Sequence, residues 1–341
     1  MPTKKIPSGT VRVPISPRVP DLRFRRYRGT EDISAMVRIA NRSWKADGVV
    51  WSISEEDLTS DLLNPVNMDP ELDLVLAEVS GELVGYGSVY WRRKSKVLRL
   101  YSQSVSLLPE WRGKGIRWAL LRHNEKRIRQ IARRHGYSDR KFIETWTNEE
   151  PNDWKTLIEG EGYEPSWHLF ELVRNDLNNI PDFRLPKHLE IRPVEPRHER
   201  MLWEAAKEAM ADERNFSEDS WNDENYEKVR SLPEYSPQLA QVAWDGDEIA
   251  GGVHVYIREE ENKELNRKRG YTETIFVRRP WRRMGVARAL IASSLRVLRD
   301  LGMEEAALDV DTDNPSGALK LYEGLGYRLF KQFVFYRKPL A

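Results

Sequence analysis

The chain has 341 residues, no cysteine and nearly balanced charge, with 55 lysines and arginines against 54 aspartates and glutamates. A chain of this length accommodates two domains of about 150 to 170 residues, each with its own core. Balanced charge gives no general attraction to nucleic acid or to a membrane surface. The lack of cysteine excludes disulfides, thiolate metal sites and a cysteine nucleophile, and it is compatible with a reducing cytoplasm.

The first 20 residues carry five prolines and no apolar stretch long enough for a signal peptide or a membrane span. We therefore expect residues 1–20 to be a flexible N-terminal arm, and the protein to be cytoplasmic with no membrane partner. The periodicity of the first half then predicts alternating strands and helices. In order, these are a strand at 22–27, helices at 32–45 and 55–63, strands at 72–79, 83–91 and 97–107, a helix ending near 135, a strand at 142–146, a helix at 153–158 and a strand at 167–173.

The second half repeats this order of elements. It predicts a strand at 189–194, helices at 200–211 and 223–230, strands at 240–244, 249–257 and 272–277, a helix at 289–301, a strand at 306–310, a helix at 316–325 and a final pair of strands ending at 336. The acidic run at 259–261 is interpreted as a solvated loop. Residues 175–187 are rich in Asn, Asp and Pro and are the expected linker. We therefore expect an N-terminal domain at 21–174 and a C-terminal domain at 188–341, called here the first and second copies.

A glycine-containing loop occurs once in each copy, where a strand-like segment meets a helix. The loops read Arg112-Gly113-Lys114-Gly115-Ile116-Arg117 and Arg282-Arg283-Met284-Gly285-Val286-Ala287, 170 positions apart (285 minus 115). Backbone N–H groups and the positive end of a helix converge at such a junction, which suits an anion. Neither loop has Gly-Lys followed by Ser or Thr, so a Walker-type phosphate loop is excluded.

A second match lies near the end of each copy. Glu159-Gly160-Glu161-Gly162-Tyr163 corresponds to Glu323-Gly324-Leu325-Gly326-Tyr327 at an offset of 164 (323 minus 159). In the second copy the order is a strand, Arg-x-x-Gly-x-Ala, a helix, a strand, Asp313-Asn314-Pro315 and a helix with Tyr322. This order resembles the GNAT superfamily of acetyl-coenzyme A dependent N-acetyltransferases. The resemblance implies an α+β fold of two tandem GNAT domains, each a mixed, mostly antiparallel sheet flanked by helices.

The resemblance also implies a set of coenzyme contacts. Splayed strand ends would expose backbone groups of 275–277 to the pantetheine and thioester, and the glycine loops would hold the pyrophosphate. The first copy has Arg117 at the usual small sixth position of the loop, where its side chain would either clash with the coenzyme or contact a phosphate. The expected coenzyme-binding residues are Ile275, Phe276, Val277, Arg282, Arg283, Met284, Gly285, Val286, Ala287 and Asn314, together with Arg112, Gly113, Lys114, Gly115 and Ile116.

Catalytic groups are expected in the second copy only. Tyr322 matches the family position whose tyrosine commonly protonates the departing thiolate, although a tyrosine there also suits a core. Glu273, or a water chain in its place, is the candidate base, and an ion-paired role for Glu273 stays open. The first copy has Ile158 for the tyrosine and, at the same offset of 170 as the loops, Gln103 for the glutamate. We therefore predict that the first copy has lost catalysis.

The predicted activity is transfer of an acetyl group from acetyl-coenzyme A to an unidentified primary amine of a small molecule or peptide, by direct attack. Two alternatives stay open. The two-copy architecture resembles mycothiol synthase, a small-metabolite acetyltransferase, and a regulatory protein that binds acetyl-coenzyme A without turnover would share the same motifs. The basic helix after the first loop (Lys126 among others) is interpreted as a solvated or coenzyme-contacting face, and no nucleic-acid partner is expected. Histidine spacing predicts no metal site. The acceptor and the oligomeric state are not predicted.

Overall fold

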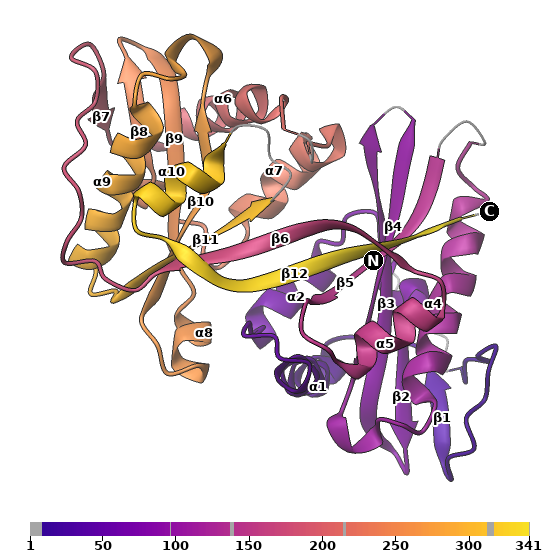
Figure 1. Ribbon diagram of the computed structural model, residues 1–341. Coiled ribbons are helices and arrows are strands. Elements are labelled where there is room, and N and C mark those ends of the chain that lie inside the picture. Colours follow the sequence, from indigo (N-terminus) through magenta and orange to yellow (C-terminus); the bar gives the residue numbers. More distant parts are fainter. Residues whose placement is uncertain (1–8, 96, 137–139, 214–215, 312–316, 341) are drawn as a thin grey trace. The chain divides into compact units, whose positions relative to one another are not determined.

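The computed structural model describes residues 9–95, 97–136, 140–213, 216–311 and 317–340. By its packing the chain divides into two compact units (Figure 1). Unit 1 contains Met1–Ser166, Ser217–Ser220 and Val334–Ala341, and unit 2 contains Trp167–Phe216 and Trp221–Phe333. In the described residues, no helix is long and apolar enough to cross a membrane.

The sheet of unit 1 has the strand order β1-β2-β3-β4-β5-β12. The pairs β1–β2, β2–β3 and β3–β4 are antiparallel, whereas β4 and β5 run parallel. Their bounds are β1 Leu22–Arg25, β2 Leu74–Val79, β3 Glu82–Ser95, β4 Leu98–Leu107, β5 Arg140–Asn148 and β12 Arg328–Pro339, which belongs to unit 1 from Val334 onward. The sheet is therefore mixed and mostly antiparallel, as expected.

Helices cover both faces of the central strands of unit 1. Helices α1 (Ile33–Ala46) and α4 (Ile116–Ala132) both pack on β3 and β4 and lie on either side of them in Figure 1. The others are α2 (Glu55–Leu63), α3 (Pro70–Asp73) and α5 (Asp153–Gly160). The described part of the N-terminal arm packs on this unit, because Val11, Val13 and Val19 contact the hydrophobic core.

Unit 2 repeats this plan, with strand order β6-β11-β10-β9-β8-β7. Here β10 and β11 form the parallel pair and the other described pairs are antiparallel. The strand bounds are β6 Glu164–Arg174, β7 Glu190–Arg192, β8 Gln241–Asp245, β9 Glu248–Ile257, β10 Arg269–Val277 and β11 Glu305–Asp311.

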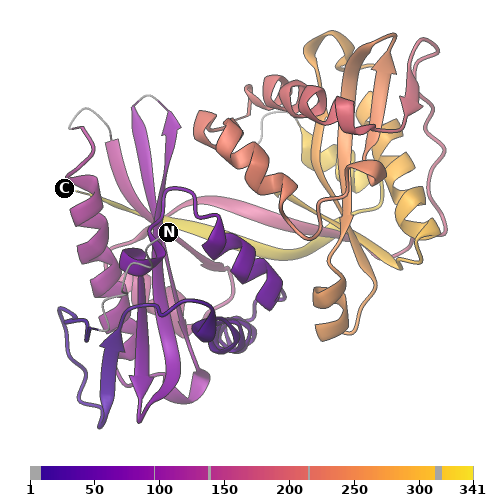
Figure 2. The same ribbon diagram turned by 180° about the vertical axis from the view of Figure 1, so that it is seen from behind.

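Helices α6 (Glu199–Met210) and α9 (Val286–Asp300) lie on either side of the central strands of unit 2, as the two opposite views show (Figures 1 and 2). Leu290, Ile291, Leu295 and Leu298 of α9 are fully buried and recur at helical spacing, so they form the face by which this helix packs. The remaining helices are α7 (Asp223–Arg230), α8 (Glu259–Glu264) and α10 (Ala318–Gly324).

Two expectations about local structure were wrong. The chain from Arg328 to Pro339 is a single strand, β12, because no Gly, Pro, Asn or Asp supplies a turn before Pro339. The run at 259–261 opens the helix α8, where carboxylates are favoured near the positive helix end. Glu261 is buried and accepts hydrogen bonds from the Tyr271 hydroxyl and the Arg267 guanidinium.

The expected domain boundaries at 174 and 188 remain a prediction. Packing groups Trp167–Phe216 with unit 2 and the last residues of the chain, from Val334, with unit 1. The Leu169–Arg174 part of β6 pairs with β11 inside unit 2. Each unit therefore contains a strand segment from the sequence of the other copy.

Candidate functional site

A cavity of about 670 Å³ opens in unit 2 where the end of β10, the start of α9, the end of α6 and α10 meet. It brings together most of the residues predicted for the second copy. The lining includes Ile275, Phe276, Val277, Arg282, Arg283, Gly285, Val286, Ala287 and Tyr322. Met284 and Glu273 lie outside this lining, and Asn314 lies outside the described residues.

The cavity is lined in part by strand β10, which is bulged at this point. Glu273 faces His254 and Phe276 faces Gly252, so two β10 residues, Thr274 and Ile275, stand opposite one residue of β9. Thr274 has a φ of 47°, in the left-handed region that β-branched residues rarely adopt. On its other side, β10 pairs with β11 only as far as Tyr271, so the two parallel strands separate beside the bulge. Residues 275–277, which line the cavity, therefore have no partner in β11.

The glycine loop forms the adjoining wall. Gly285 is the N-cap of α9, with a φ of 84°, and a Cβ added there would meet no protein atom within 4 Å. The first N–H groups of a helix have no partner within it, so those of Val286, Ala287 and Arg288 are available to an anion. The structure thus places a helix N-terminus with a small residue before it at the cavity.

The two loop arginines have different surroundings. Arg282 donates to the Asp212 carboxylate at 2.8 Å, to the Val277 carbonyl at 2.9 Å and to the Ala209 carbonyl at 3.1 Å. Its guanidinium therefore joins the loop to the segment after α6. Arg283 has a φ of 63° and, among the described residues, no ion-pair partner, so its charge is available to a ligand. The sequence contained no signal for Asp212, which lies 70 positions from Arg282.

Tyr322 of α10 lies in the cavity wall, with 7% of its surface exposed. Burial, followed by the charge of Glu273, raises the pKa of its phenol above the ordinary value. The phenol is therefore protonated at neutral pH. Within the part of the chain that the structure describes, its hydroxyl has no hydrogen-bond partner, and its ring lies edge-on to that of Tyr327, with ring centroids 6.3 Å apart.

Glu273 lies at the point where β10 and β11 separate. Its carboxylate accepts a hydrogen bond of 2.9 Å from the backbone N–H of Asp309, which no longer has a strand partner in β10. Burial and the nearby Asp309 carboxyl raise the pKa of Glu273 well above its usual range. Asp309 itself reaches solvent, but the protein atoms around its carboxyl and the charge of Glu171 raise its pKa to about 7. Both carboxyls therefore keep their protons to higher pH than free carboxyls do.

The bulge in β10 changes which residue of the first copy corresponds to Glu273, which the sequence offset matched to Gln103. Phe276 faces Gly252, and the matching pair in unit 1 is Ser106 and Tyr86. Two residues further along these partner strands, His254 faces Glu273 whereas Ser88 faces Ser104. Because β4 has no bulge at this point, the counterpart of Glu273 is Ser104 and not Gln103. Either residue leaves the first copy without a carboxylate there.

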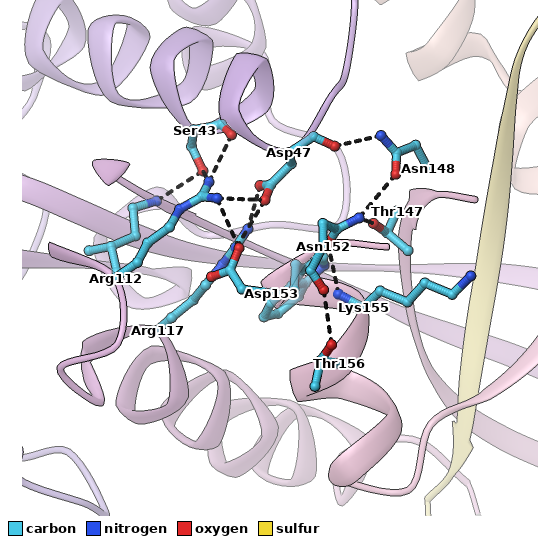
Figure 3. Close-up of polar contacts among 12 residues, drawn as sticks. Ser43, Asp47, Arg112, Arg117, Thr147, Asn148, Asn152, Asp153, Lys155 and Thr156 are labelled. Atoms are coloured by element: carbon cyan, nitrogen blue, oxygen red, sulfur yellow. Dashed lines mark hydrogen bonds and ion pairs between the residues drawn. The ribbon is translucent and has the colours of Figure 1, made fainter. Parts of the chain in front are cut away.

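The corresponding region of unit 1 is filled by charged side chains (Figure 3). Arg117 donates to the Asp47 carboxylate at 2.7 and 3.2 Å and to Asp153 at 3.0 Å, and its guanidinium lies over the Trp154 ring, 4.8 Å from the centroid. Arg112 also contacts both aspartates, at 3.0 and 2.8 Å. The remaining cavity measures about 30 Å³.

The glycine loop of unit 1 keeps its backbone shape. Gly113 and Gly115 have φ values of 72° and 79°, matching Arg283 and Gly285. The N-terminal arm lies against it, since a Cβ on Gly115 would come within 3.7 Å of Pro17. Lys114 lies over the Trp111 ring at 5.2 Å, and Ile116 is fully buried in the core. The loop of the first copy therefore keeps the backbone geometry of an anion site, but its side chains are engaged elsewhere.

No group of three His, Asp or Glu residues that could hold a metal ion occurs among the residues the structure describes.

The sequence profile of the acetyltransferase (GNAT) family matches residues 34–153 and 202–327. Mycothiol acetyltransferase of Geodermatophilus obscurus is 24% identical over 311 residues, covering 90% of this chain and 94% of the relative. Two solved structures share the fold. A GCN5-related N-acetyltransferase from Sphaerobacter thermophilus has a TM-score of 0.71 at 22% identity, covering 94% of this chain and 96% of its own. A tandem GNAT protein from the clavulanic acid biosynthesis pathway has a TM-score of 0.69 at 14% identity, with coverages of 93% and 98%.

Proposed function

Because the chain belongs to the acetyltransferase (GNAT) family, we propose that unit 2 transfers the acetyl group of acetyl-coenzyme A to a primary amine. The observation that carries this proposal is the contrast between two equivalent regions. In unit 2 a bulged strand, a glycine loop and Tyr322 meet around a cavity of about 670 Å³, whereas in unit 1 Arg117 fills the equivalent region. We therefore assign binding and turnover to the second copy.

The glycine loop and the bulged strand would hold different parts of acetyl-coenzyme A. The N–H groups at the start of α9 suit the pyrophosphate, and Arg283 adds a positive charge there. Backbone groups of Ile275 and Phe276, on the edge of β10 that has no partner in β11, suit the amides of the pantetheine and the thioester carbonyl. Arg282 contributes by fixing the loop to Asp212, as a positioning residue.

In the proposed reaction, the amine nitrogen attacks the thioester carbonyl carbon, and the carbon–sulfur bond breaks. Tyr322 gives its phenolic proton to the departing thiolate, which suits a phenol that burial keeps protonated. Glu273, directly or through a water, takes a proton from the attacking amine. A carboxyl with a raised pKa suits this role, since its ionised form is a stronger base than an ordinary carboxylate.

One comparison narrows the class of amine that would accept the acetyl group. The relative from Geodermatophilus obscurus matches across 90% of this chain and is a mycothiol acetyltransferase. We propose a small-metabolite amine as the acceptor on this ground. Side chains of α6 and α7 and their loops would select it, because such variable elements shape acceptor pockets.

A matched pair of loop variants tests the assignment to the second copy. Gly115→Glu and Gly285→Glu place the same carboxylate at equivalent left-handed positions, and neither new Cβ meets a protein atom closer than 3.7 Å. Turnover is followed as thiol release from acetyl-coenzyme A across a broad panel of amines. We expect Gly285→Glu to abolish turnover and Gly115→Glu to retain it. Loss of turnover in Gly115→Glu alone would assign the reaction to the first copy.

A further inference from the structure

A second cavity, of about 420 Å³, lies in unit 1 away from the glycine loop. Its walls come from the described part of the N-terminal arm, the residue after β1, the α3 region and the middle of α4. This volume lies within the range typical of small-molecule sites. No sequence motif marks this cavity, because its lining comes from four separate parts of the chain.

Positive charge dominates the lining. Arg12, Arg26, Lys126 and Arg127 line the cavity, against a single acidic residue, Glu71. Arg127 is neutralised by Asp73, with 2.6 Å between Nε and Oδ1. The other cations have no carboxylate within ion-pair distance among the residues that the structure describes, and Arg26 donates only to the Leu72 carbonyl, at 2.8 Å. Burial and the charge of Arg127 lower the pKa of Arg26, and the charges of Asp73 and Asp69 only partly offset them.

His123 of α4 supplies an independent observation. It lines the same cavity, is nine-tenths buried, and its Nδ1 is buried without a hydrogen-bond partner among the described residues. A buried polar atom without a partner costs free energy, which a bound group can recover. Burial and the charges of Arg26, Lys126 and Arg127 lower the pKa of His123 to about 4, so the ring is neutral at pH 7.

We propose that this cavity binds a small oxyanionic metabolite, one that carries phosphate or carboxylate groups. Arg12, Arg26 and Lys126 would meet the oxyanion with charge-assisted hydrogen bonds, and His123 would hydrogen-bond to the ligand at the buried end of the cavity. Two other basic residues of α4 already have carboxylate partners: Arg122 and Arg129 pair with Glu125 at 2.8 and 3.4 Å. Lys126 has no such partner among the described residues, so its charge is available to a ligand.

Site-resolved NMR on the full chain tests the proposal. The protein contains six histidines, so ¹³C labelling of their rings gives a small set of signals, and His123→Gln assigns the one of interest. Pyrophosphate and citrate serve as the phosphate and carboxylate probes. We expect at least one of them to shift the His123 signal in a saturable manner and to raise its pKa, since a bound anion stabilises the charged ring. The more effective probe identifies the oxyanion class.

Two charge-reversal variants provide the control. Lys126→Glu changes the cavity lining, whereas Arg133→Glu changes an exposed cation at the end of the same helix, outside the cavity. Lys126→Glu should weaken the binding of the effective probe by roughly tenfold or more, and Arg133→Glu should leave it within about twofold. The proposal is overturned if neither probe moves the His123 signal, or if both variants weaken binding equally.

Discussion

Arg117 and Asp47 form a buried ion pair with two hydrogen bonds, 2.7 Å from Nη2 to Oδ2 and 3.2 Å from Nη1 to Oδ1. Both side chains are 7% exposed. In unit 2 the loop position of Arg117 is held by Ala287, and the equivalent region is an open cavity. One residue type at one loop position therefore distinguishes a filled region from an open one, and it accounts for the unequal chemistry that we propose for the two copies.

The first prediction concerns this ion pair. Arg117→Ala should lower the free energy of unfolding by about 3 kcal/mol, because it leaves Asp47 buried with only Arg112 as a charged partner. Urea denaturation measures the change. The exposed Arg133 gives the control, since Arg133→Ala should cost less than about 0.5 kcal/mol. Equal costs for the two variants would show that the buried pair does not stabilise unit 1.

Arg117→Ala should not create turnover in unit 1, because Ile158 there has no proton to give.

The second prediction separates the two loop arginines. Arg283→Ala should raise the KM for acetyl-coenzyme A roughly tenfold while the unfolding midpoint stays nearly unchanged, because Arg283 has no ion-pair partner among the described residues. Arg282→Ala should lower stability as well, since it removes the contacts with Asp212 and two carbonyls. Steady-state kinetics and thermal unfolding of both variants measure the difference. A stability loss in Arg283→Ala equal to that in Arg282→Ala would contradict the assignment.

The third prediction concerns Tyr322. Tyr322→Phe should lower kcat by about 10²- to 10⁴-fold with little change in coenzyme affinity, because it removes only the proton donor. Tyr327→Phe is the matched control, since its hydroxyl bonds to Thr272 at 2.8 Å. That variant should lose roughly 1 kcal/mol of stability and keep its chemical step. Unchanged kcat in Tyr322→Phe would remove its role as the acid.

The fourth prediction concerns pH. If Glu273 is the base, kcat/KM should rise with pH as Glu273 ionises, at a pH above the ordinary range of a carboxyl, and then level off. Glu273→Gln should lower kcat/KM and abolish this rise. Asp309→Asn should move the rise to lower pH, because it removes the neighbouring carboxyl while keeping the backbone N–H that bonds to Glu273. A profile that is the same in all three proteins would favour water as the base.

The pair of Glu273 and Asp309 has a consequence for stability. Its folded-state pKa values are raised, so between about pH 4 and pH 7 the folded chain binds more protons than the unfolded chain. The pair therefore makes stability fall as the pH rises through this range. Glu273→Gln should reduce that fall, which denaturation at a series of pH values would show.

Much of the fold could be predicted from local sequence. Helix α2 begins and ends where its pattern placed it, because Ser54 and Asp57 form a capping box. The hairpin of β2 and β3 was predicted by its turn, Ser80-Gly81, in which both residues have positive φ. These signals lie within a few residues of the element that they define.

Other features depend on contacts between distant residues and could not be predicted. The bulge at Thr274 could not be predicted, because no glycine marks it in the sequence. It shifts the counterpart of Glu273 from Gln103 to Ser104. Nothing in the sequence links Arg117 to Asp47, 70 positions away, so the choice between a clash and a phosphate contact stayed open. The structure offers a third outcome, an internal ion pair that fills the region.

The central claim is that one copy binds acetyl-coenzyme A, and counting sites tests it most directly. Isothermal titration of the full chain with acetyl-coenzyme A should give one site per chain. Gly285→Glu should remove that site, and Gly115→Glu should keep it. Two sites per chain, or a single site that disappears in Gly115→Glu and persists in Gly285→Glu, would contradict the account.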